Sequence, residues 1–461
     1  MNASRRHFLR TAAGLATALP GARAPLALSL AGLGTLAAER ALAADTSGYR
    51  ALVCLFMHGG SDMHNWVVPT DATNYAAYAK VRAELTWPSS KLQPIRSGSQ
   101  EAGRSFGMPL ELAPLRSWYE SGRAAVLANV GPLVRPITKA DYQAGGSGVP
   151  PKLYSHNDQQ STWQSLAPEG ASSGWGGRMG DLFMSANGQP VFTAVSANGN
   201  AVFLTGRSVL QYQVGADGPI SANALTKTWL LGSSSAAPIL RRVLLAGGSN
   251  DFQTEYVRIT QRSLATTDAL RSAITSTGIG ALPSTMASDV LAKQLRVVAQ
   301  MIAAGPGLGM RRQVFMVSIG GFDSHSFQMR DQPLLMGRVA NAVDWFLRAL
   351  QGVGMLDSAT LFSASDFGRT LTSNGDGSDH GWGSHHFIAG GAVRGGDIYG
   401  RFPITALGTD TDVGSGRLLP TTSVTQYAAT LGRWMGLSPT ELATVLPNLN
   451  QFSQPDLGFL A

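Results

Sequence analysis

Four short apolar runs, rich in β-branched and aromatic residues, lie at 51–57, 124–130, 313–319 and 359–364. Runs of this length and composition are typical of strands buried on both faces of a largely parallel sheet. Between the last two runs, residues 332–351 carry apolar side chains at helical spacing. A strand, a helix and a strand in this order predict an α/β fold with helices packed against the sheet.

The rest of the chain adds helices to this pattern. Residues 239–302 are predicted to be mainly helical, and shorter helices are expected at 423–435 and 439–445. We expect one domain at 44–461, with an insertion or cap at 185–308 where the strand pattern is interrupted.

The N-terminus carries an export pattern. Residues 4–10 read Ser-Arg-Arg-His-Phe-Leu-Arg, in the order and spacing of a twin-arginine signal, and an apolar run at 24–38 and small residues at 41–43 follow. The apolar run is shorter than the roughly 20 residues of a membrane-spanning helix, so a removable signal is expected at 1–43. An uncleaved anchor is the alternative. The expected location is periplasmic or secreted, after contact with the twin-arginine translocase and without a stable membrane span.

Charge and cysteine content exclude some classes of protein. The formal net charge is +7, of which the five arginines and one glutamate of 1–43 account for four. No basic run with interleaved aromatic residues is present, so no nucleic-acid partner is expected. The single cysteine, Cys54, lies inside the first apolar run and is expected to be a buried, inert thiol.

Polar side chains follow most of the apolar runs. The stretch from Ile319 to Phe387 holds four of the eight histidines and several aspartates. Open α/β sheets bind ligands at the carboxyl ends of their strands, and imidazoles with carboxylates suit metal or acid/base chemistry. A functional site is therefore predicted at this edge of the sheet.

Within that stretch, Asp323 and His325 are two residues apart and can face the same side of an extended segment. Their spacing suits two metal ligands, or a carboxylate that orients an imidazole. The alternative is a loop in which the carboxylate and the imidazole only hydrogen-bond each other. His380 stands in a Gly-, Ser- and Asn-rich loop and is the strongest single candidate. His385 and His386 are adjacent, so at most one of them is expected to join the site.

Two further residues follow the fourth run. Asp366 would project into the same crevice, and Arg369 could clamp an anionic group with two hydrogen bonds. The alternative for Arg369 is a salt bridge that only shapes the loop.

The first run leads into two glycines, which allow close backbone approach, and then into Ser61 and Asp62. Asp62 is either a ligand or the cap of the next helix. His58 and His64 read as ordinary loop histidines. A second polar cluster at 154–163 makes His156 a candidate for the substrate side of the crevice, unless that loop only positions Trp163.

Several known chemistries are not supported. The chain has no Gly-x-Ser-x-Gly, no phosphate-binding P-loop, no His-Glu-x-x-His and no Cys-x-x-Cys. The first strand is also not followed by the Gly-x-Gly-x-x-Gly of a dinucleotide-binding fold.

A set of motifs in this order resembles a bacterial family of twin-arginine-exported proteins, domain-of-unknown-function family 1501. The shared motifs are Gly-Gly-x-Asp (59–62), Ser-His-x-Asp-x-Gln (155–160), Gly-Trp-x-x-Arg (174–178), Gly-Phe-Asp-x-His (321–325), Asp-Phe-Gly-Arg-Thr (366–370) and Asp-His-Gly-Trp-Gly (379–383). They span nearly the whole chain after the signal.

That family resembles the alkaline phosphatase and sulfatase superfamily, which implies a three-layer fold with a mostly parallel sheet and metal ligands at strand ends. By this resemblance Asp62 or His58 would lie near the first ligand, and His380 would match a late histidine. Phe367 stands where that superfamily has the histidine of an Asp-His pair. No Cys-x-Pro-x-Arg is present, and no hydroxyl beyond Ser61 stands near the nucleophile position.

The expected function is hydrolysis of a small phosphate or sulfate ester with a divalent metal, whether zinc, manganese, magnesium or calcium. The alternative is a catalytically degenerate protein of this fold that binds a ligand or partner in the cell envelope. The metal-ligand candidates are Asp62, Asp323, His325, Asp366 and His380, and the catalytic candidates are Ser61, Arg369 and His156.

Overall fold

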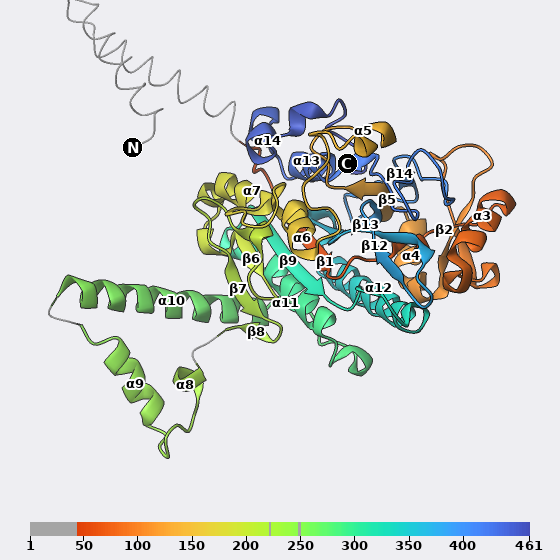
Figure 1. Ribbon diagram of the computed structural model, residues 1–461. Coiled ribbons are helices and arrows are strands. Elements are labelled where there is room, and N and C mark those ends of the chain that lie inside the picture. The colour runs from red at the N-terminus through yellow and green to blue at the C-terminus, as the bar shows by residue number, and fades with distance from the viewer. Residues whose placement is uncertain (1–43, 221–222, 248–249) are drawn as a thin grey trace, which may run out of the picture.

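The structure is a computed structural model, and it describes residues 44–220, 223–247 and 250–461 (Figure 1). The predicted signal at 1–43 lies outside these residues. None of the described helices combines the length and the apolar character that crossing a bilayer requires.

A mostly parallel sheet forms the centre of the molecule, in the strand order β14-β5-β13-β10-β1-β9-β6-β7-β8 with β15 beside β5. The four predicted strands are confirmed as β1 (Arg50–Met57), β5 (Ala124–Gly131), β9 (Arg312–Ile319) and β10 (Ala359–Ser365). β1 pairs in parallel with both β9 and β10. The other strands of this sheet are β6 (Ala194–Ser196), β7 (Tyr212–Gly215), β8 (Gly218–Pro219), β13 (Ser384–Gly390), β14 (Ile398–Tyr399) and β15 (Thr422–Ser423).

Among the strands that were not expected, β13 has a central place in the sheet. β13 lies between β10 and β5 and runs antiparallel to both, so β5 points the same way as β10 without touching it. Two small sheets stand apart: β2 (Val68–Pro69), β3 (Leu92–Ile95) and β4 (Phe106–Pro109) form one, and β11 (Arg369–Ser373) and β12 (Ser378–His380) form the other. His380, predicted to lie in a loop, therefore ends a short strand.

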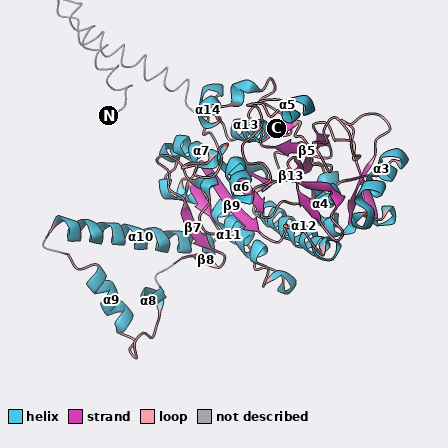
Figure 2. Cartoon of the chain, in the orientation of Figure 1, coloured by secondary structure: helices cyan, strands magenta, loops and turns pink. Residues whose placement is uncertain are grey.

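Helices cover both faces of the central sheet, which gives three layers (Figure 2). Side chains of β1 alternate between two apolar cores: Val53 and Leu55 join one, while Leu52 and Cys54 join the other. The first core includes α4 (Ala113–Glu120), α11 (Val290–Ala304) and α12 (Gln328–Gly352), and the second includes α6 (His156–Ser165), α7 (Trp175–Phe183), α13 (Val424–Trp434) and α14 (Pro439–Val445). The predicted α/β class is confirmed, and Cys54 is buried and free as expected.

The segment 185–308 contains two kinds of element. β6 pairs with β9 in the central sheet, and α11 is buried against the main core. In contrast, α8 (Asn223–Thr226), α9 (Ala236–Leu244) and α10 (Asp251–Thr275) project away from the body (Figure 1). The remaining helices are α3 (Ala72–Arg82) and α5 (Lys139–Gln143).

Candidate metal site

Three segments far apart in the sequence meet beyond the carboxyl ends of the central strands. His156 is the first residue of α6, Asp323 lies in the loop after β9, and His380 ends β12. Each offers one ligand atom, and the three atoms lie within 4.8 Å of one another. The loops of Asp323 and His380, two of those predicted to lie at this edge, meet there together with His156.

The separations of these atoms suit one small cation. His156 Nε2 lies 3.5 Å from Asp323 Oδ2, and His380 Nε2 lies 3.4 Å from Asp323 Oδ1. His325 adjoins the group, with its Nε2 3.2 Å from Asp323 Oδ1. A tetrahedron of bonds about 2.0 Å long has edges of about 3.3 Å, and each imidazole Nε2 lies near that distance from one of the two Asp323 oxygens.

Two of the imidazoles are anchored on their other nitrogen. His380 Nδ1 lies 2.8 Å from the Tyr154 carbonyl oxygen, and His156 Nδ1 lies 2.7 Å from Asp366 Oδ2. Both partners are acceptors, so each Nδ1 carries the proton and each Nε2 presents a lone pair. Gln160 Nε2 donates to the same Asp366 oxygen, at 2.8 Å. This is the outer arrangement that metal-binding histidines use.

The third imidazole follows the same pattern. His325 Nδ1 faces Asp379 Oδ1 at 3.2 Å, and Asn374 donates to that carboxylate. The two Nε2 atoms of His325 and His380 then lie 2.8 Å apart. That is a hydrogen-bond distance, at which one of the two nitrogens carries a proton, and a cation held by both imidazoles would take the place of that proton. The donor set therefore fits a metal ion.

Backbone conformation brings these loops together. Tyr154, whose carbonyl meets His380, has a φ of +71°, a left-handed conformation that costs free energy in a residue with a side chain. A Cβ on Gly59 would lie 2.3 Å from the Asp323 amide nitrogen, and one on Gly60 would lie 2.3 Å from the Phe367 ring. The two glycines after β1 are thus required for the close approach of the site loops.

Phe367 forms an apolar wall beside the histidines. Its ring centroid is 4.8 Å from that of His156 and 4.5 Å from that of His380. The side chain is buried, so it shields one side of both imidazoles from water.

The charges of the site are balanced by one buried arginine. Arg369 Nη1 donates to Asp323 Oδ1 at 2.8 Å. Partial burial raises the pKa of Asp323, but the hydrogen bond and charge of Arg369 outweigh this and the net pKa is lowered. Burial lowers the pKa of His380, which favours the neutral, ligating form. The hydrogen bond from Asn374 is the main reason why the pKa of Asp379 is lowered.

The structure does not bring Asp62 to this group. Its carboxylate is buried, forms an ion pair with Arg82, and accepts a hydrogen bond from Gln328. It also accepts from the backbone N–H of His64 at 3.2 Å, which is the capping role that the sequence also allowed. Ser61 is likewise buried, and its Oγ lies 3.4 Å from Met63 Sδ.

Two other predicted residues lie behind the ligand atoms. Asp366 contacts His156 from the outer side, and its second oxygen is buried with no partner among the described residues. Arg369 has no exposed side-chain surface and donates to Asp323, to Ser378 and, at 3.3 Å, to the Gly59 carbonyl. Both residues hold the ligands in place.

Three other histidines of the described residues, His64, His385 and His386, lie away from this group. His385 and His386 in β13 point to opposite faces: His385 stacks on Phe402, and His386 contacts Trp163. Neither reaches the candidate metal-binding group of His156, Asp323 and His380. The expectation was that at most one of the two histidines would join the site. His64 is buried against the Arg369 carbonyl, at 3.3 Å.

Two contributions were missed from the sequence. Gln160 anchors Asp366, and the signal for it was its place four residues after His156, on the same helical face. The Tyr154 carbonyl leaves no such trace, because any residue can supply a backbone oxygen.

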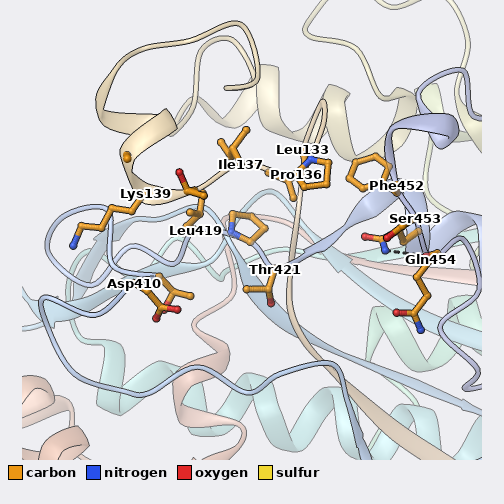
Figure 3. A pocket seen from close by; sticks show the side chains of 15 residues that line it. Leu133, Pro136, Ile137, Lys139, Asp410, Leu419, Thr421, Phe452, Ser453 and Gln454 are labelled. Atoms are coloured by element: carbon orange, nitrogen blue, oxygen red, sulfur yellow. Dashed lines mark hydrogen bonds between the residues drawn. The ribbon is translucent and has the colours of Figure 1, made fainter.

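A cavity of about 600 Å³ lies away from the candidate metal site. Figure 3 shows Lys139 and Asp410 at one end of it and Phe452 and Gln454 at the other. No histidine lines it, and none of the candidate site residues does.

The chain belongs to the family described as protein of unknown function (DUF1501), whose model matches residues 49–447. This is the family that the motifs indicated. Among curated proteins, no match is found.

Several solved structures align with most of this chain at low TM-scores. A sulfatase from Pseudoalteromonas sp. aligns with a TM-score of 0.37 and 9% identity, over 90% of this chain and 74% of that one. A 2-O GAG sulfatase gives 0.30 and 10%, over 86% and 72%. The lipoteichoic acid synthase LtaP from Listeria monocytogenes gives 0.29 and 8%, over 86% and 74%.

Proposed function

We propose that this protein is a hydrolase of phosphate or sulfate esters that uses one divalent metal ion. His156, Asp323 and His380 would hold the ion, with His325 beside them. The observation that carries the proposal is the convergence of imidazole Nε2 atoms on one carboxylate, each with its Nδ1 tied to an acceptor.

The donor set favours zinc among the metals considered. Imidazole nitrogens with one carboxylate oxygen are common zinc ligands, and manganese also accepts such a set. Magnesium and calcium prefer sites built entirely from oxygen.

A bound ion of this kind would polarise the ester oxygen and lower the pKa of bound water. The residues of the chain have supporting roles: Asp366 keeps the Nδ1 proton on His156, and Arg369 orients Asp323. Because Ser61 Oγ packs against Met63, water is the attacking group in this proposal.

The ester class is supported by the order of the motifs that resemble the phosphatase and sulfatase superfamily. The number of metal ions is supported by Phe367, an apolar ring where that superfamily has a histidine ligand. A single ion is therefore proposed.

The substrate would be a small anionic ester met after export. The support is the twin-arginine pattern at 4–10 with its apolar run and small-residue cleavage site. A periplasmic or secreted location follows within this proposal, with the twin-arginine translocase as a transient partner.

The test is metal analysis of protein purified without chelator, followed by assays on aryl and alkyl phosphate and sulfate esters. We expect close to one metal ion per chain and turnover of at least one ester, with both lost in Asp323→Ala and His380→Ala. Asp410→Ala is the matched control, since it removes an exposed carboxylate whose ion-pair partner within the described part of the chain is Arg401. Absence of metal and turnover would overturn the proposal. Metal without turnover would contradict the hydrolase alone.

A further inference from the structure

A second cavity, of about 280 Å³, lies directly beside the metal-binding group. It is bounded by residues at the carboxyl ends of β1, β6 and β9 and by one face of α6. His58 and Gln160 line it, and Gln160 also anchors the Asp366 carboxylate that orients His156. Through Gln160 and Asp366, the cavity adjoins the Nδ1 side of the His156 imidazole.

The face of α6 that lines the cavity is made of amides and one hydroxyl. Asn157, Gln160, Ser161 and Gln164 recur at intervals of three and four residues, so they share one side of the helix. His156 begins the same helix. One rigid element therefore carries both a proposed metal ligand and the wall of the cavity.

Gln160 and Gln164 each use only one of their two polar side-chain atoms in a hydrogen bond to a described residue. Gln164 Oε1 accepts from the Phe203 amide at 3.0 Å, and no described residue accepts from its Nε2. Gln160 is the reverse: its Nε2 donates to Asp366, and no described residue donates to its Oε1. The helix thus offers a donor and an acceptor to the cavity.

The opposite wall repeats this arrangement. Asn200 Oδ1 accepts from Gln211 at 3.1 Å and from Gln213, while its Nδ2 has no described partner. Asn198 Nδ2 donates to Ser318 Oγ at 2.5 Å, while its Oδ1 has none. The two walls together therefore leave two donors and two acceptors without a partner among the described residues.

The rest of the lining limits what can bind. Glu169 also lines the cavity and no lysine or arginine does, so a second anionic group would meet a carboxylate and no cation. No aromatic ring other than the imidazole of His58 lines it, and the apolar surface comes only from Ala201, Val202 and Met316. Aryl and long alkyl groups therefore fit poorly. Hydroxyl groups fit well, because each can donate and accept.

We propose that this cavity binds a neutral polyhydroxylated group, a sugar ring or a comparable polyol. The idea that this group is part of an ester substrate rests on the proposed function. The assignment as a binding site rests on the cavity alone. One hydrogen bond contributes about 0.5–1.5 kcal/mol, so each amide should change affinity about two- to tenfold.

The experiment is a saturation-transfer-difference NMR titration of the full protein. The probes are methyl glucoside, methyl galactoside, glucose 6-phosphate and glucose 6-sulfate, with N-acetyl-alanine amide and benzyl alcohol as a peptide-like and an aryl probe. We expect at least one sugar or sugar ester to bind, and the other two probes to give no specific signal.

Two variants test the cavity without breaking its internal bonds. Gln164→Glu and Asn200→Asp keep the oxygens that accept from Phe203 and from Gln211, but replace the free donor with an acceptor. Each should weaken sugar binding about two- to tenfold, while Asn341→Ala, which removes a surface amide on α12, should not.

The outcomes separate the two proposals. Neutral glycosides should still bind to His380→Ala, which lacks a metal ligand, so this result does not depend on the metal. If no sugar binds to protein that holds its metal, or if both cavity variants bind as the parent does, this inference fails and the proposed function stands. Preferential binding of the peptide-like probe would also overturn it.

Discussion

At the scale of single residues, the metal-binding group depends on what each imidazole meets on its outer side. The Asp366 carboxylate is fully buried, accepts from Gln160 and His156, and keeps one oxygen without a described partner. Burying a carboxylate in this way costs free energy of hydration unless a nearby positive charge compensates for it. A cation on the other side of His156 would supply that charge.

Replacing Asp366 with Asn should therefore weaken metal binding while keeping the fold. The amide oxygen can still accept the His156 Nδ1 proton, but the negative charge that increases imidazole basicity is lost. Changes of this kind typically cost about 10- to 100-fold in metal affinity. Competition against a chromogenic chelator measures it, and unchanged affinity would show that the Asp366 charge does not act through His156.

The three buried histidines outside the site should make stability depend on pH. Burial lowers the pKa of His64 to about 4 and that of His386 to about 3, and it also lowers the pKa of His385. In the unfolded chain each titrates near 6.5, so below that pH the unfolded state binds more protons. The free energy of unfolding should fall from about pH 6.5 towards pH 4, by up to about 1.4 kcal/mol per pH unit for each histidine.

His386→Phe isolates one of these contributions. Its unfolding free energy should show a shallower pH slope than the parent, by about one proton, while the metal-site histidines contribute equally to both proteins. Urea unfolding at pH 7.0, 6.0 and 5.0 measures the slopes. Parallel slopes would mean that His386 is protonated in the folded protein.

At the scale of elements, local pattern predicted some strands and not others. Continuous apolar runs predicted β1, β5, β9 and β10, and apolar residues at helical spacing predicted α12. β13 is buried on both faces, but it begins with Ser384, His385 and His386. These polar residues interrupt the apolar run by which a buried strand is predicted. Its antiparallel place between β10 and β5 depends on long-range pairing, which no local window contains.

The site shows the same division between what is local and what is not. The sequence singled out Asp323 and His325 in a polar loop after a buried strand and His380 in a Gly-, Ser- and Asn-rich loop. It assigned His156, in a separate polar cluster, to the substrate side of the crevice. It could not show which way Asp62 turns. That depends on Arg82, a buried cation twenty positions later whose own helix, α3, has little apolar pattern.

The projecting helices are a third case, because their apolar residues are not all buried. On α10, Phe252 is 90% exposed, whereas Leu270 is fully buried where the helix meets the body. Phe252→Ser should therefore change the free energy of unfolding by no more than about 0.5 kcal/mol. Leu270→Ala should cost about 2–5 kcal/mol.

Urea denaturation of both variants, followed by tryptophan fluorescence, checks this contrast. A cost for Phe252→Ser comparable with that of Leu270→Ala would mean that the outer part of α10 is covered in solution.

At the scale of the whole molecule, the metal-binding group links segments that are distant in sequence. α6, the loop after β9 and the β11–β12 hairpin each supply part of it, and they meet only in the folded protein. Because the unfolded chain holds no preformed site, binding free energy adds to folding free energy.

Metal should therefore stabilise the whole domain. At a free concentration a hundredfold above Kd, zinc should raise the free energy of unfolding by about 2.7 kcal/mol, and a chelator should reverse the gain. Calorimetry of the chelator-treated protein, with and without added zinc, measures the change in Tm. Asp323→Ala should lose the shift, because Asp323 is the carboxylate on which the imidazoles converge. An equal shift in that variant would show that zinc binds the folded protein elsewhere.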